Sequence, residues 1–225
     1  MFARHDLVWL SAEGWRQALA GAPAEHAAAV AAWQQADRPL VVRRADADQA
    51  PGQVALGLAL PPRVEDGRKV RIPCRVAARE VRHREAPLPL ARALGTLPRW
   101  DAALAALESN AANEGIGLRV YGSLALQVLT GQAYLTANSD IDLLVQPRDA
   151  AELDAALALL GAHAAGLPLD GEIVFPGGRA VAWKEWAAAR TGAPGSRVLM
   201  KEMTRVSLVT ADSLLAALEE DACTN

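Results

Sequence analysis

The stretch VYGSLALQVLTGQAYLTANSDIDLLV, residues 120–145, predicts a short strand, a sharp Gly-Ser turn into a helix, and a second strand. Gly122 lets the backbone turn sharply and approach a ligand, and Ser123 begins a helix whose free N–H groups face the same space. A turn of this kind binds anions, typically phosphate or pyrophosphate. Gly122 and Ser123 are therefore predicted to bind the phosphate part of a substrate.

Asp140-Ile141-Asp142 opens the second strand of this stretch. Because residues i and i+2 of a strand point to the same side, both carboxylates are expected to face one space while Ile141 turns into the core. Two neighbouring anions repel each other, and the arrangement becomes favourable when a hard divalent cation lies between them. Asp140 and Asp142 are therefore predicted to be catalytic and to hold Mg²⁺.

Two-metal and base-assisted sites usually contain a third carboxylate. Glu172, at the head of the apolar run Ile173-Val174-Phe175, is the first candidate for this catalytic acid. Asp170 is the alternative, but the neighbouring Gly171 and Pro168 weaken the strand pattern around it. Glu172 is therefore preferred, and Asp170 stays open.

Alternating helical and extended patterns in the rest of the chain predict an α+β protein of two domains. Helices are expected at 12–20, 24–35, 100–113, 124–130 and 149–160, and strands at 40–42, 53–60, 69–76, 118–121, 140–145, 172–175 and 180–183. The charged, proline-bearing segment 79–90 is the expected boundary. It divides a small N-terminal α/β domain, residues 1–85, from a domain over 86–225 with a mixed sheet flanked by helices.

Composition excludes several classes of protein. Of the 225 residues 52% are apolar and 22% are charged, which is typical of a folded globular chain. The net charge of -3, with acids and bases mixed, argues against a nucleic-acid-binding face. No apolar run reaches the roughly 18 residues that span a bilayer, and residues 1–10 lack a secretory signal. We expect a cytoplasmic protein with neither a nucleic-acid nor a membrane partner, and with Cys74 and Cys223 reduced.

Residues 120–145 resemble the nucleotidyltransferase superfamily typified by DNA polymerase beta, although the spacer over 124–139 is longer than in most members. The chain resembles more closely the malonate decarboxylase holo-acyl carrier protein synthases, also called phosphoribosyl-dephospho-CoA transferases. The motifs that carry this resemblance are RHDLVWL at 4–10, YGSLALQ at 121–127, SDIDLL at 139–144 and DGEIVFPGGRAVAWKEW at 170–186.

The resemblance implies a polymerase-beta-like domain over 86–225 and a Mg²⁺-dependent transfer. The donor would be 2'-(5''-triphosphoribosyl)-3'-dephospho-CoA, the acceptor a serine of the apo acyl carrier subunit of malonate decarboxylase, and the leaving group diphosphate. Asp140 and Asp142 would hold Mg²⁺, and Gly122 with Ser123 would bind the departing diphosphate. Glu172 would complete metal binding or accept the serine proton.

Two other functions fit the same residues. Another Mg²⁺-dependent nucleotidyltransferase, with ATP as donor, would carry the same apparatus, and a non-catalytic carrier-binding module would keep the fold without turnover. Lys184 and Lys201 could add positive charge near the phosphates, although an exposed lysine is usually only solvated. His5 is expected to be structural. The N-terminal domain could recognise either the carrier or the donor, and no motif decides between them.

Overall fold

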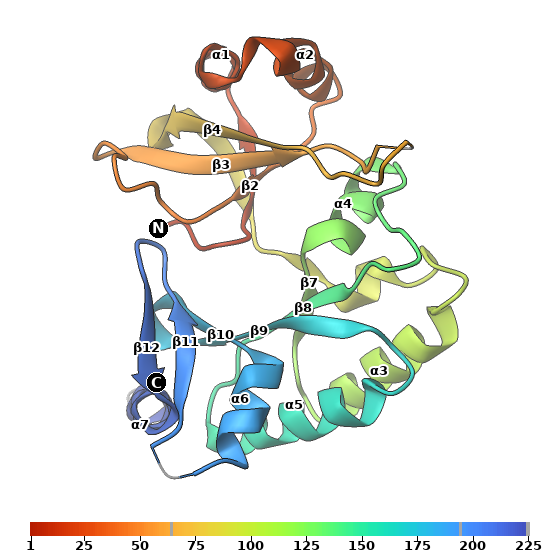
Figure 1. Cartoon of the computed structure of the whole chain (residues 1–225), viewed down its shortest axis with the longest axis vertical. Helices are drawn as coiled ribbons and strands as arrows, with labels where there is room; N and C mark the ends of the chain where they lie inside the picture. The colour runs from red at the N-terminus through yellow and green to blue at the C-terminus, as the bar shows by residue number, and fades with distance from the viewer. Residues whose placement is uncertain (64, 194, 224–225) are drawn as a thin grey trace.

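Two sheets, each covered by helices on its outer face, make up the molecule (Figure 1). The computed structural model describes residues 1–63, 65–193 and 195–223. The mixture of helices and strands confirms the predicted α+β class. None of the helices in these ranges is both long enough and apolar enough to cross a membrane.

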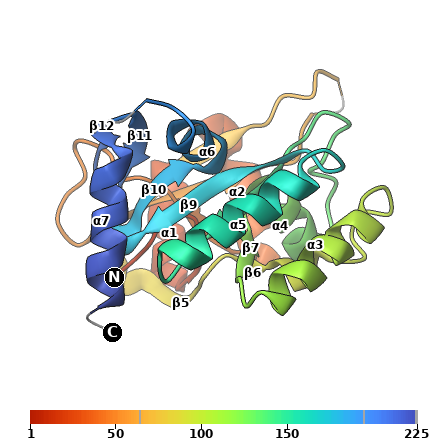
Figure 2. The ribbon, with the colours of Figure 1, turned by 90° about the horizontal axis from the view of Figure 1, so that it is seen from below.

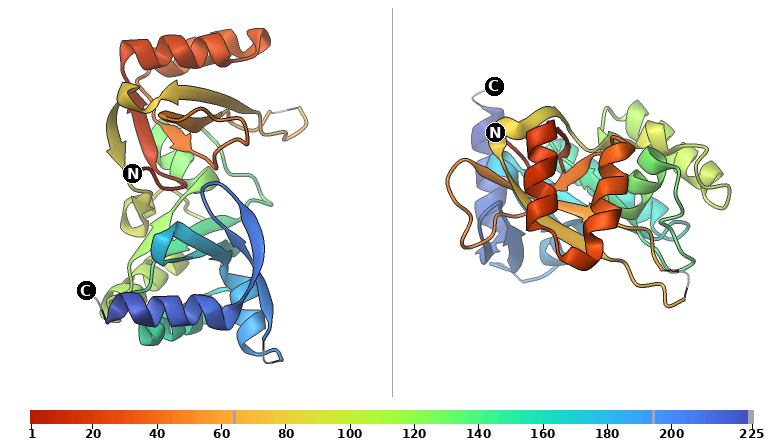
Figure 3. Two further views of the ribbon diagram at one scale, coloured as in Figure 1. Left: turned by 90° about the vertical axis from the view of Figure 1, so that its left-hand side faces the viewer. Right: turned by 90° about the horizontal axis from the view of Figure 1, so that it is seen from above.

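The first sheet has five strands in the order β4-β3-β2-β1-β5, and all neighbours are antiparallel. The strands are β1 (Leu7–Leu10), β2 (Leu40–Val42), β3 (Gln53–Ala59), β4 (Arg71–Ala77) and β5 (Val81–Glu85). Helices α1 (Ala12–Gly21) and α2 (Ala27–Gln35) lie on the sheet face that points away from the rest of the molecule (Figures 1 and 3). The other face is turned toward the second sheet.

The second sheet has seven strands in the order β12-β11-β10-β9-β8-β7-β6. They are β6 (Leu88–Pro89), β7 (Leu118–Val120), β8 (Ile141–Val145), β9 (Leu169–Phe175), β10 (Arg179–Ala182), β11 (Arg197–Lys201) and β12 (Val206–Thr210). Strands β8 and β9 are parallel, and a parallel pair needs a long crossover connection. Helix α5 (Ala150–His163) supplies it, and the Asp149 side chain caps its N-terminus by accepting a bond from the Glu152 N–H at 2.8 Å.

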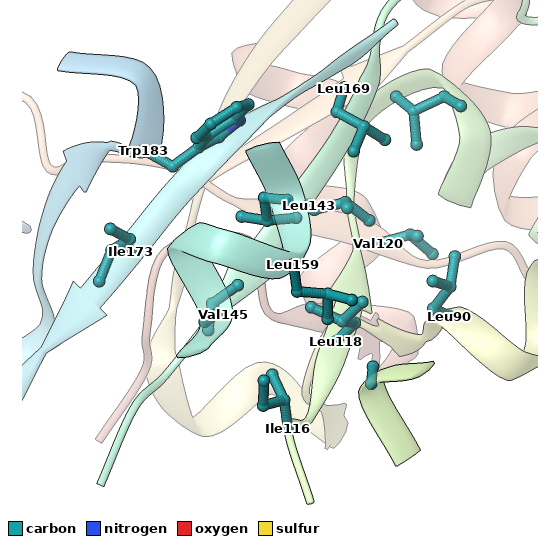
Figure 4. Packing of buried hydrophobic residues seen from close by; sticks show 14 of the residues in the cluster. Leu90, Ile116, Leu118, Val120, Leu143, Val145, Leu159, Leu169, Ile173 and Trp183 are labelled. Carbon is teal, nitrogen blue, oxygen red and sulfur yellow. The ribbon is translucent and has the colours of Figure 1, made fainter. Parts of the chain in front are cut away.

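Helices cover the face of the second sheet that points away from the first sheet. Figure 2 shows α5, α3 (Asp101–Asn113) and α7 (Ala211–Ala222) on this side. Apolar strand residues such as Leu143, Val145 and Ile173 belong here to one buried cluster with Leu159 of α5 (Figure 4). Strand side chains alternate, so Asp142, which lies between Ile141 and Leu143 on β8, points to the opposite face, toward the first sheet. Asp170, which lies between Leu169 and Gly171 on β9, points to the same face as Asp142.

Several predicted strands are confirmed, including those expected at 53–60, 69–76 and 180–183, which are β3, β4 and β10. The start of β9 was predicted wrongly, because the strand begins at Leu169 and includes Asp170. Gly171 has a φ of 131°, and a Cβ built on it would lie 1.9 Å from the Leu143 carbonyl oxygen. The glycine that weakened the strand pattern is thus the residue that allows β9 to approach β8.

We expect Gly171→Ala to destabilise the protein by about 2–5 kcal/mol, since it combines a strained backbone conformation with a steric clash. Urea unfolding followed by circular dichroism measures the loss. Gly161→Ala is the matched control, because an added Cβ on this residue of α5 meets nothing within 4 Å. The control should gain up to about 1 kcal/mol of helix stability. Equal stabilities of the two variants would contradict this account of β8–β9 pairing.

Candidate active site

A cavity of about 710 Å³ lies between the two sheets and is lined by residues of both. Gly122, Ser123, Asp140 and Asp142, four of the five predicted site residues, line this cavity. Glu172, the fifth, is not among the lining residues. The Gly-Ser turn and the two aspartates are thus brought together, as the spacing in the sequence predicted.

Close contact with Asp142 explains the glycine of the turn. Gly122 is the first residue of α4 (Gly122–Thr130) and has a φ of 65°. A Cβ at this position would lie 2.1 Å from Asp142 Oδ2. The absence of a side chain therefore lets the aspartate lie directly against the start of α4, where free backbone N–H groups are available to an anion.

Asp140 and Asp142 form an acidic wall of the cavity, and Asp170 lies beside Asp142 on the neighbouring strand. Asp142 lies on β8, Asp140 immediately precedes β8, and Asp170 is the register partner of Asp142 on β9. Burial, together with the charges of Asp170 and Asp140, raises the pKa of Asp142 to about 6. In the described parts of the chain, neither Asp140 nor Asp142 forms a salt bridge within 4.0 Å. Asp140 and Asp142 thus repel each other with no cationic side chain bonded to either among the described residues.

This arrangement fits the ligand preference of Mg²⁺. No group of three His, Cys, Asp or Glu side chains among the described residues is placed to hold a metal ion by itself. Mg²⁺, however, commonly uses one or two carboxylates and completes its coordination with water and substrate phosphates. Asp140 and Asp142, beside the predicted anion-binding turn, supply such a set of carboxylates.

Glu172 lies at the centre of a separate ionic cluster. Its side chain is 5% exposed and accepts hydrogen bonds from Arg4 Nη2 at 2.9 and 3.0 Å and from Lys201 Nζ at 2.8 Å. His5 Nε2 lies 3.4 Å from Oε2. Burial acts to raise the pKa of Glu172, but the bonds from His5, Lys201 and Arg4 outweigh it and hold the pKa well below its usual range. The carboxylate is therefore charged and fully engaged.

The cluster joins segments that are distant in the sequence. Arg4 and His5 precede β1, Glu172 is on β9 and Lys201 ends β11. His5 has a φ of 70°, which is rare for a residue with a side chain, and its ring packs on Tyr121 with centroids 4.0 Å apart. Lys201, which from sequence could have been either a solvated lysine or a source of charge near the phosphates, binds Glu172. The ion pair between Arg4 and Glu172 was not predicted, because no local pattern shows a partner 168 residues away.

The part of the long spacer that follows α4, residues 131–139, packs on the first domain. Tyr134 is 1% exposed, belongs to the same buried apolar cluster as the strands and helices of the first domain, and donates its hydroxyl to the Ala59 carbonyl at 2.7 Å. Gln127 Oε1 holds the spacer by accepting bonds from the backbone N–H groups of Tyr134 and Leu135, each at 3.1 Å. These spacer residues thus connect the second domain to the first beside the cavity.

We expect Glu172→Gln to lower the free energy of unfolding at pH 7 by about 2–4 kcal/mol, because it leaves Arg4 and Lys201 without their counter-charge. Lys201 is partly exposed, and its contact with water reduces this loss. A group with a lowered folded-state pKa stabilises the protein above its unfolded value, here 4.5, and loses that effect as the pH falls. Urea unfolding at several pH values should therefore show the difference from wild type shrinking below about pH 4.5. A difference that stays constant down to pH 3 would contradict the assignment.

Comparisons with known proteins identify the family of the chain. The family model described as phosphoribosyl-dephospho-CoA transferase MdcG N-terminal domain matches residues 3–87, and the model of the MdcG C-terminal domain matches residues 87–212. No solved structure gives a significant match.

Curated relatives extend over most of the chain. The phosphoribosyl-dephospho-CoA transferase of Bradyrhizobium diazoefficiens is 39% identical over 211 residues, which cover 92% of this chain and 89% of the relative. The enzyme of the same name from Xanthomonas campestris pv. campestris (strain 8004) is 38% identical over 191 residues, covering 83% and 86%. That of Pseudomonas fluorescens is 33% identical over 213 residues, covering 92% and 91%. The chain therefore belongs to the phosphoribosyl-dephospho-CoA transferase family of enzymes.

Proposed function

We propose that this transferase moves the phosphoribosyl-dephospho-CoA group from 2'-(5''-triphosphoribosyl)-3'-dephospho-CoA to a serine of the apo acyl carrier subunit of malonate decarboxylase, with release of diphosphate. The observation that carries the proposal is the meeting of the Gly122-Ser123 turn with Asp140 and Asp142 in one cavity of a chain from this family. An anion-binding turn beside paired carboxylates suits the transfer of a phosphoryl group.

Phosphoryl transfer depends mainly on positioning and charge neutralisation. The backbone N–H groups at the start of α4 and the Ser123 hydroxyl would bind and orient the diphosphate portion of the donor. Asp140 and Asp142 would hold Mg²⁺, which when bound would neutralise charge on the phosphate oxygens. The cavity between the sheets would limit the access of water to the reacting phosphate.

Asp170 is the better placed candidate for the third acid. It is the register partner of Asp142, shares its face of the sheet, and is 44% exposed, with Lys184 Nζ 3.9 Å away. Glu172 was the preferred candidate from sequence, but its carboxylate is already bonded to Arg4 and Lys201. We assign to Asp170 the role of completing the acidic site, and to Glu172 that of positioning the segments around it.

The test is the intact mass of the purified apo acyl carrier subunit after incubation with this protein, Mg²⁺ and the triphosphoribosyl-dephospho-CoA donor. The proposal expects a mass gain equal to the phosphoribosyl-dephospho-CoA group, abolished by EDTA. Asp140→Asn and Asp142→Asn should each slow the transfer by at least about 100-fold, because each removes charge aimed at the transition state. Asp154→Asn, a change of an exposed aspartate on α5, is the matched control and should retain the wild-type rate.

Parallel reactions separate the alternatives. An AMP-sized gain with ATP, and none with the triphosphoribosyl donor, would replace the proposal with a nucleotidyltransferase that uses ATP. No gain with either donor would favour a non-catalytic carrier-binding module. Wild-type rates in both aspartate variants would contradict the metal-holding role while leaving the transfer itself intact.

A further inference from the structure

The cavity has walls of opposite charge that come from different domains. Its basic residues all belong to the first domain and its acidic residues, Asp140 and Asp142, to the second. The basic residues are Arg4, Arg43, Arg44, Lys69 and Arg71. This separation is unexpected in a chain whose charges are otherwise mixed, and it concentrates positive charge opposite the aspartates.

Two of these cations are already engaged with protein carboxylates. Arg4 binds Glu172, and Arg43 binds Asp46. The other three, Arg44, Lys69 and Arg71, are exposed and form no salt bridge with any residue that the structure describes. We call these three residues the cationic wall. They are the cavity cations whose charge remains available to a ligand.

Lys69 places the cationic wall directly at the predicted phosphate site. Its Nζ donates to Ser123 Oγ at 2.7 Å, across the interface between the two domains. Arg71 follows two residues later at the start of β4, on the strand face opposite the buried Ile72 and Cys74. Lys69 and Arg71 both lie near enough to Asp142 to act electrostatically on its carboxyl group. The wall therefore faces the space between the aspartates and the start of α4.

An anionic donor needs such a wall. A triphosphate carries about four negative charges at neutral pH, and Asp140 and Asp142 would repel it. Backbone N–H groups at one helix end compensate only part of this repulsion. Cations inside a cavity act more strongly on phosphates than cations on an open surface, because the surrounding protein reduces screening by water.

We infer that Lys69, Arg71 and Arg44 bind the triphosphate end of the donor and hold it against the Gly122-Ser123 turn, opposite Asp140 and Asp142. The inference rests on the proposed function and deepens it, because it gives the first domain the role of recognising the donor. A docking site for an acidic carrier protein is less consistent with the position of the wall, which lines a cavity and contacts the Ser123 hydroxyl.

Calorimetric titration of the full-length protein with inorganic triphosphate tests the inference without requiring turnover. Lys69→Ala combined with Arg71→Ala should weaken binding at least about tenfold, and Arg44→Ala should weaken it less. Added salt should weaken the binding by the wild type more than that by the double variant, because the wild type makes more charge contacts. Arg71→Lys keeps the charge and should restore most of the affinity lost in Arg71→Ala.

Arg68→Ala is the matched control, because Arg68 is an exposed residue of the same loop that does not line the cavity. It should bind triphosphate as the wild type does. Equal affinities of the wild type and the double variant for triphosphate would overturn the inference. A transfer assay would also overturn it if the double variant raised KM for the carrier but not for the donor. If the wild type binds triphosphate through the cationic wall but modifies no carrier, the inferred binding role of the wall is supported and the proposed acceptor is wrong.

Discussion

The buried carboxylate of Glu172 is the contact on which the geometry of the cavity depends. It binds Arg4 from the N-terminal segment and Lys201 from β11, and it lies next to His5, whose ring packs on Tyr121. Tyr121 directly precedes the Gly-Ser turn, so the same cluster positions that turn. Because a buried charge is tolerated only with its partners in place, the ion cluster fixes how the first domain lies on the second.

Because the two domains are held in this arrangement, both sheets contribute residues to the site. The second sheet presents Asp142 and Asp170 on its open face, and its other face is used for packing against helices. The first sheet presents Arg71 across the cavity, and the loop that leads into β4 presents Lys69. Neither sheet alone combines acids for a metal with cations for a phosphate. The spacer residue Tyr134, buried in the apolar cluster of the first domain, adds a second connection between the domains.

The sequence was most informative where function depends on neighbouring residues. The Gly-Ser turn and Asp140-Ile141-Asp142 could be predicted because strand alternation and helix starts are local, and the structure places them in one cavity. Strand β5 was not predicted, because VRHRE carries mostly exposed charged residues and shows no apolar alternation. The start of β9 was missed because Gly171 was interpreted as a break, although it serves a close approach of strands. The contacts Arg4–Glu172 and Lys69–Ser123 span 168 and 54 residues, and only the tertiary fold reveals them.

The most direct test of a site shared by two domains is a crystal structure with Mn²⁺, which replaces Mg²⁺ and scatters anomalously, and with a non-hydrolysable analogue of the triphosphoribosyl donor. The account predicts an anomalous peak between Asp140 and Asp142, with the phosphates of the analogue lying between that peak and the side chains of Lys69 and Arg71. An analogue bound outside the cavity, or an anomalous peak away from both aspartates, would contradict it.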